Sequence, residues 1–152
     1  MGRLVDTFTL ERHIPIRSAG AATLKTHLKQ RGLEPDESYF ITNESLIRER
    51  RVDFDVTHDP PPDLAIEVEI SQSAVDKLAI YGDLGVAEVW FYDGDSLRMH
   101  ILQSDGSYET QPRSSLLPQL TKEILEAFLV RRHESDETSW VRAFHEWVRS
   151  LP

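Results

Sequence analysis

The segment PPDLAIEVEISQSAVDK, residues 61–77, constrains the fold more than any other part of the chain. Period-2 spacing puts alternate residues on opposite faces of a strand. One face would carry Leu64, Ile66, Val68 and Ile70, and the other Asp63, Glu67 and Glu69. Carboxylates within a core strand are costly unless they are paired, hydrogen-bonded or bound to a cation. The acidic face of this strand must therefore meet either solvent or a site that compensates the charges.

Two interpretations of the acidic face follow from the residues alone. In the simpler one, Glu67 and Glu69 lie on the solvent face of an antiparallel sheet and Lys77 is exposed. In the other, Asp36 of the strand DESYFI joins them from a neighbouring strand, and Lys77 follows on a helix. Carboxylates from two strands suit Mg²⁺, and phosphodiester hydrolysis needs such a metal together with a cation for the developing charge. Spacing alone leaves both interpretations open.

The rest of the chain predicts the elements around this strand. We expect a short helix within residues 19–33 that ends at Gly32, a strand within 34–41 and a half-buried strand at 52–56 closed by prolines. A helix should start at Ser71 or Ser73 and run to about Leu84, followed by a strand within 87–94. Residues 97–111 predict a hairpin with Asp105-Gly106 at its turn.

Two amphipathic helices are expected after Pro118, and they complete the predicted fold class. Trp140, Phe144 and Trp147 share one face of the second helix, which should pack on the sheet or in a dimer interface. Tyr81 follows Lys77 by four residues on one helix side, and packing is its expected role. The whole predicts a single α/β (α+β) domain over residues 1–152, with a mixed central sheet flanked by helices.

Composition excludes several classes of function. The chain of 152 residues has no cysteine, so it has no disulfides, thiolate zinc site or cysteine nucleophile. Its net charge of −9 disfavours broad non-specific binding of nucleic acid, although bound cations reverse the local sign at a carboxylate site. Zinc-protease, GxSxG and phosphate-loop motifs are absent from the sequence. The sequence contains neither a long apolar run nor a signal-peptide core, so we expect a cytoplasmic protein without membrane contact.

Three motifs together resemble a known family. EPDESYF, PPPDLAIEVEIS and KLAIYGDLGVAEVWFYDG, within about residues 15–117, are similar to the putative restriction endonuclease family of bacterial proteins, part of the PD-(D/E)XK nuclease superfamily. The resemblance implies a restriction-endonuclease-like fold with the acids on adjacent central strands. By position, Asp36 matches the first motif aspartate and Glu67 the (D/E) position. Glu69 stands where the superfamily motif has lysine. In the family that this chain resembles, the following helix supplies the lysine, and Lys77 matches that position.

The resemblance implies a Mg²⁺- or Mn²⁺-dependent DNA endonuclease. Asp36, Glu67 and Glu69 would be metal ligands, and Lys77 would orient the attacking water or stabilise the phosphorane. Asp63 also resembles a family position, where capping of a turn is the favoured role. The alternative is a non-catalytic interaction or regulatory module with the same fold, which the charge of −9 and Glu69 favour.

The region before Asp36 resembles a shortened version of the family pattern, in which a helix there packs on the sheet. A sheet left partly uncovered would predict a homodimer. The basic residues that could contact phosphates are Lys25, Lys29, Arg31, Arg48, Arg50 and Arg51.

Overall fold

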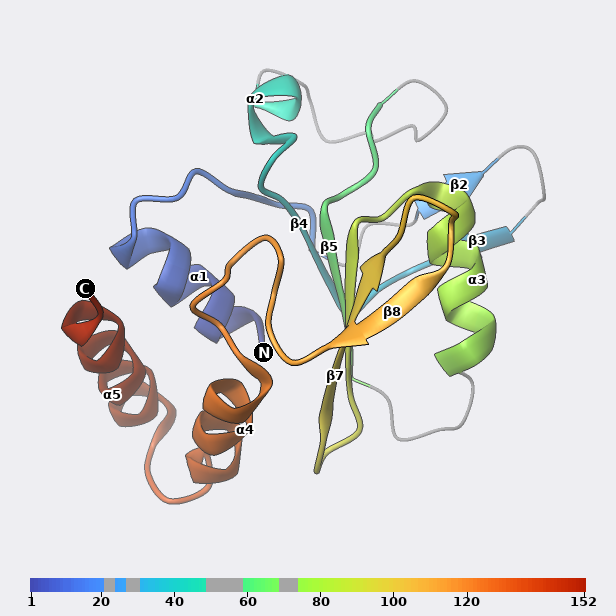
Figure 1. Ribbon diagram of the computed structural model, residues 1–152. Helices are drawn as coiled ribbons and strands as arrows, with labels where there is room; N and C mark the ends of the chain where they lie inside the picture. The colour runs from blue at the N-terminus through green and yellow to red at the C-terminus, as the bar shows by residue number, and fades with distance from the viewer. Residues whose placement is uncertain (21–23, 27–30, 49–58, 69–73) are drawn as a thin grey trace.

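The computed structural model describes residues 1–20, 24–26, 31–48, 59–68 and 74–152 (Figure 1). The helices are α1 (Gly2–Glu11), α2 (Glu44–Ile47), α3 (Ala74–Leu84), α4 (Lys122–Arg131) and α5 (Glu137–Ser150). The strands are β1 (Arg17–Ser18), β2 (Leu24–Thr26), β3 (Arg31–Leu33), β4 (Glu37–Phe40), β5 (Leu64–Val68), β6 (Glu88–Tyr92), β7 (Leu97–Leu102) and β8 (Tyr108–Gln111).

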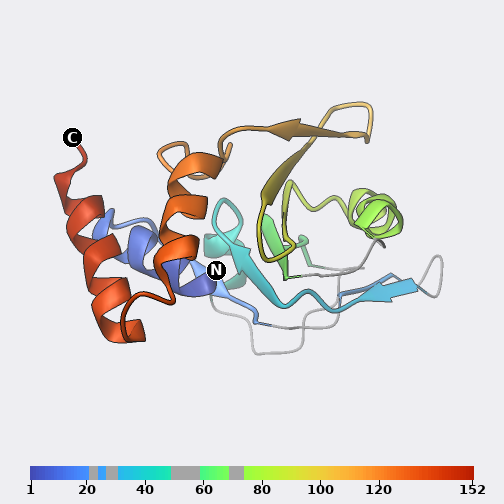
Figure 2. The ribbon, with the colours of Figure 1, turned by 90° about the horizontal axis from the view of Figure 1, so that it is seen from below.

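Six strands form a mixed sheet in the order β1-β4-β5-β6-β7-β8, and β2 and β3 form a separate hairpin. The pair β5–β6 is parallel, joined through α3, whereas its neighbours in the sheet pair antiparallel. Helix α3 lies on one face of the sheet, and α1, α4 and α5 gather on the other (Figures 1 and 2). The predicted α/β (α+β) class and mixed sheet are confirmed.

Strand β5 is buried on both faces because it runs through the middle of these layers. Leu64 and Ile66 belong to the core shared with α1, α4 and α5. Ala65 belongs to the second core, on the α3 side, with Tyr81. Glu67 shares the face of Ala65 by alternation and is only 3% exposed. The solvent-face interpretation is therefore wrong for Glu67.

The helix predicted within residues 19–33 is wrong. The structure has strands β2 and β3 there, with Leu24 opposite Leu33 and Lys25 opposite Gly32. Leu33 packs against the core beneath α3. A short apolar pattern does not distinguish a helix from a strand, and here tertiary packing decides the outcome. The strand predicted at 52–56 lies outside the described residues.

Helix α1 covers the sheet where the sequence predicted an open face. Leu4, Val5 and Phe8 are fully buried and pack with residues of β4 and β5 in the larger core. The helix also packs against α5. The expectation of an uncovered sheet is thus wrong for this face, and the homodimer inferred from it stays a prediction.

The predicted hairpin and the two C-terminal helices are confirmed, whereas α5 makes its main contacts with α1 and α4. Gly106 has φ +84° in the turn between β7 and β8, which explains the glycine of the Asp-Gly pair. The N-cap side chains Thr121 and Asp136 accept backbone hydrogen bonds at the starts of α4 and α5. Trp140 and Phe144 are buried in the core of this chain. None of the helices in the described ranges has the length and apolar character needed to cross a membrane.

A buried carboxylate anchors the segment that leads into α4. Glu88 of β6 is 0% exposed. Its Oε1 accepts from Trp90 Nε1 at 2.5 Å. Its Oε2 accepts from the Ser115 N–H at 2.9 Å, the Ser115 hydroxyl at 2.8 Å and the Leu116 N–H at 3.3 Å. This carboxylate therefore joins the central sheet to the 112–121 connection.

Candidate active site

The register between β4 and β5 brings the two predicted acids together. Glu37 pairs with Ile66 and Ser38 with Ala65 in an antiparallel ladder. Continuing that register by one residue sets Asp36 opposite Glu67. Cross-strand partners project to the same face of a sheet, and here that face is the one covered by α3. Two acids that are 31 positions apart in the sequence thus become neighbours.

Glu67 is buried with a partner on each carboxylate oxygen. Its Oε2 lies 2.8 Å from Lys77 Nζ. Its Oε1 accepts a hydrogen bond from the Tyr81 hydroxyl at 2.6 Å. Lys77 and Tyr81 are four residues apart on α3, so both side chains point from one helix face onto β5. The ion pair and the hydrogen bond explain how a core strand tolerates a carboxylate.

The environment of Tyr81 makes its hydroxyl a permanent donor. Burial raises the pKa of Tyr81 most, followed by its hydrogen bond to Glu67 and by the negative charge of Glu67. The charge of Asp36 raises it further, as expected for an acid on the same face. The phenol therefore stays protonated across the physiological range.

Asp36 lies at the solvent side of the same cluster. Its side chain is exposed, and its Oδ2 accepts the Val68 N–H at 2.6 Å. Val68 directly follows Glu67 and is 48% exposed. The hydrogen bond thus fixes the Asp36 carboxylate against the end of β5. Asp36, Glu67 and Lys77 are brought together, whereas Glu69 lies outside the described residues.

The donor set suits a divalent cation that keeps part of its water shell. Mg²⁺ is usually held by one or two carboxylates together with water and substrate phosphate. Asp36, just before β4, and Glu67, in β5, provide two carboxylates near the end of β5. Within the described ranges, no group of three or more His, Asp or Glu side chains could hold a metal. The two carboxylates of Asp36 and Glu67 fit a cation that, like Mg²⁺, keeps several waters in its coordination shell.

Asp63 has the capping role that the sequence favoured. Its Oδ2 accepts from the backbone N–H groups of Ile41 at 2.7 Å and Asn43 at 3.0 Å. Its Oδ1 accepts from the Asn43 side chain at 3.0 Å. These bonds fix the connection between β4 and α2, so Asp63 supports the turn beyond β4.

The basic residues proposed for phosphate contact are only partly described. The Arg48 guanidinium binds the Glu44 carboxylate at 3.0 and 2.6 Å, which gives it a local structural partner. Lys29, Arg50 and Arg51 lie outside the described residues, as do the side chains of Lys25 and Arg31.

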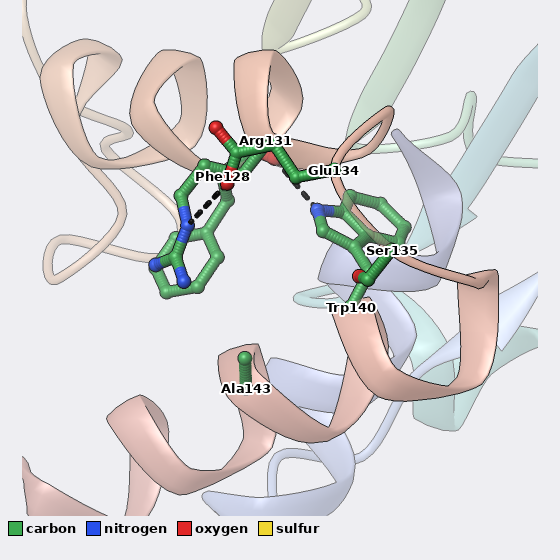
Figure 3. Close-up of a pocket in the computed structure, with 6 residues that line it drawn as sticks. All are labelled: Phe128, Arg131, Glu134, Ser135, Trp140 and Ala143. Atoms are coloured by element: carbon green, nitrogen blue, oxygen red, sulfur yellow. Dashed lines mark hydrogen bonds and ion pairs between the residues drawn. The ribbon is translucent and has the colours of Figure 1, made fainter.

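A small surface pocket lies away from this site. It has a volume of about 160 Å³ and lies between α4 and α5, on the sheet face opposite α3 (Figures 1 and 3). Its charged lining residues form an ion pair, Arg131 with Glu134, at 3.6 Å. The Arg131 guanidinium also lies 5.7 Å from the centre of the Phe128 ring. Neither Glu67 nor Asp36 contributes to this pocket.

The sequence prediction missed the contact between Tyr81 and Glu67. The signal was present, because Tyr81 follows Lys77 by four residues and therefore shares its helix face. Packing was nevertheless the expected role. The structure adds a 2.6 Å hydrogen bond to that packing.

Comparison with solved structures supports the nuclease fold. A putative nuclease from Anabaena variabilis ATCC 29413 matches with a TM-score of 0.57 and 19% sequence identity. The match covers 84% of this chain and 78% of that one. No significant match was found among curated proteins. The model of the Uma2 family, described as "Putative restriction endonuclease", matches residues 2–148 and so extends beyond the motifs on both sides. The chain therefore belongs to the Uma2 family of putative restriction endonucleases.

Proposed function

We propose that this protein is a nuclease that hydrolyses phosphodiester bonds of DNA with Mg²⁺ or Mn²⁺. Membership of a family described as "Putative restriction endonuclease" supports the reaction class and the DNA substrate. The observation that carries the proposal is the buried Glu67 carboxylate, which is bound to Lys77 and adjoins Asp36. This combination provides two acids and one cation near the end of a central strand.

In this proposal, Asp36 and Glu67 hold the metal. A divalent cation, when bound, supplies Lewis-acid activation of the phosphodiester and of water. Glu69 is proposed as an accessory ligand from its sequence position alone. The hydrogen bond from Val68 N–H keeps the Asp36 carboxylate beside the end of β5. The buried position of Glu67 fixes the second carboxylate, so the two acids need little reorganisation.

Lys77 supplies the positive charge that the reaction needs. Its side chain is 25% exposed, so the ammonium group lies at the boundary between Glu67 and solvent. From there it can donate a hydrogen bond to an attacking water or to a phosphoryl oxygen that gains negative charge. The 2.8 Å ion pair with Glu67 places the amine beside the site before a metal binds, and the flexible stem of Lys77 lets the amine move toward the substrate.

Nicking of supercoiled plasmid DNA tests this proposal. The wild-type protein should nick DNA with Mg²⁺ or Mn²⁺ and lose the activity in EDTA. Lys77→Gln should lower the rate about 10²-fold, because the glutamine amide keeps a donor but removes the charge. Lys122→Gln is the matched control, since Lys122 pairs with Glu126 on α4 and should not affect cleavage. Failure of the wild-type protein to nick DNA with either metal would contradict the proposal and favour a non-catalytic module.

A further inference from the structure

The two oxygens of Glu67 have different environments. Oε1 accepts from Tyr81, a fully buried side chain of the core between α3 and the sheet. Oε2 is paired with Lys77, whose side chain is 25% exposed. The inner oxygen is therefore tied to the core, and the outer oxygen is paired with a partly exposed side chain.

The Tyr81 hydroxyl cannot easily give up its hydrogen bond to Glu67 Oε1. The ring packs with Ala65, Val86, Val89 and Phe91, which leaves it little room to turn. The hydroxyl is buried, and a buried donor without a partner would be costly. Lys77, in contrast, has a flexible stem and access to water, so its ammonium group can shift. Only one of the two contacts to Glu67 can adapt to a ligand.

This asymmetry determines how Glu67 can bind a cation. A carboxylate that uses both oxygens on one metal must turn Oε1 toward it and away from the orientation set by the 2.6 Å hydrogen bond from Tyr81. A carboxylate that binds through Oε2 alone can keep that bond. Mg²⁺ requires near-octahedral geometry and retains waters, whereas Ca²⁺ is larger and often takes both oxygens of a carboxylate.

We propose that Tyr81 is a positioning residue that limits Glu67 to one-oxygen ligation and so makes the site select Mg²⁺ over Ca²⁺. The inference rests on the proposed function, because it needs a cation at Glu67. Tyr81, a residue of the core, would thus contribute to the metal selectivity of the site.

Metal-dependent thermal stabilisation tests this role without an activity assay. The full chain is titrated with MgCl₂ and separately with CaCl₂, and the half-saturating concentrations are compared. Tyr81→Phe keeps the ring and removes only the hydroxyl. It should weaken apparent Mg²⁺ affinity about tenfold, the size expected for a partner that orients a ligand. Ca²⁺ affinity should fall less or rise, so the preference for Mg²⁺ should fall.

Tyr108→Phe is the matched control for this experiment. Tyr108 packs against the same core and its hydroxyl donates to the backbone oxygen of Val86 at 2.5 Å, without contact to Glu67. This variant should keep the wild-type preference, although it also loses a tyrosine hydrogen bond. Circular dichroism before metal addition establishes that both variants are folded.

The outcomes separate failure of this inference from failure of the proposed function. Suppose that metal raises the melting temperature of the wild-type protein, that Glu67→Gln abolishes this rise, and that Tyr81→Phe keeps the wild-type preference for Mg²⁺. This result would overturn only the role of Tyr81. If Tyr108→Phe reduced the preference for Mg²⁺ as much as Tyr81→Phe did, the role of Tyr81 would also be overturned, because the effect would then come from the core in general. If metal does not raise the melting temperature of the wild-type protein, or still raises it in Glu67→Gln, the proposed metal site itself is wrong.

Discussion

Glu67→Gln is expected to lower the rate of Mg²⁺-dependent DNA cleavage by about three orders of magnitude, because it removes a metal ligand charge. Glutamine has nearly the shape of glutamate, so the packing of β5 against α3 should survive. Its amide can still bond to the Tyr81 hydroxyl, which can donate or accept. Lys77 loses its charge partner, but its partial exposure allows the amine to turn toward water. The substitution should therefore act on chemistry far more than on folding.

The measurement for Glu67→Gln is the single-turnover rate of plasmid nicking, with far-UV circular dichroism to verify the fold. Glu109→Gln provides the matched control, because Glu109 is an exposed carboxylate on β8. The control should cleave at the wild-type rate. If Glu67→Gln cleaved as fast as the control, Glu67 would not be a metal ligand, and the activity would have another origin.

Glu88→Ala is expected to destabilise the fold by about 4 kcal/mol, since buried donors left without acceptors cost about 1–3 kcal/mol each. The substitution removes the acceptor for the Trp90 indole and for three donors of Ser115 and Leu116. Glu88 is 0% exposed, so water cannot simply replace these bonds without some opening of the structure. The connection to α4 would lose its anchor on β6.

Urea denaturation measures this second effect. Glu109→Ala is the control, because substitutions of exposed residues usually change stability by less than about 0.5 kcal/mol. A loss smaller than about 1 kcal/mol for Glu88→Ala would show that the connection before α4 is held by other contacts. Glu88 is remote from the proposed chemistry, so the folded fraction of this variant should still nick DNA.

The sequence alone predicted the central strand and the hairpin because both have strong local signals. The alternation in LAIEVEIS identifies β5, and the Asp-Gly turn identifies β7 and β8. The sequence did not show whether solvent or another part of the protein covers the acidic face of β5. An acidic strand face has the same alternation whether water or a helix covers it, and only the placement of α3 shows that Glu67 is buried.

The residues around the site show the same limit. Lys77 and Tyr81 share a helix face by spacing, but spacing does not reveal that both contact Glu67. The neighbouring positions of Asp36 and Glu67 depend on the β4–β5 register, which the sequence does not encode locally. The helix predicted at 19–33 is wrong for a related reason. The pairing of Leu24 with Leu33 in the β2–β3 hairpin outweighs a weak local helical pattern.

We propose that Asp36 and Glu67 form one metal site, with Lys77 beside it. The most direct test is the location of Mn²⁺ by anomalous X-ray diffraction from crystals of the protein grown with the metal. An anomalous peak is expected within direct coordination distance of both the Asp36 and Glu67 carboxylates. A peak bound elsewhere, or clear density for the Glu67 side chain with no metal beside it, would contradict it.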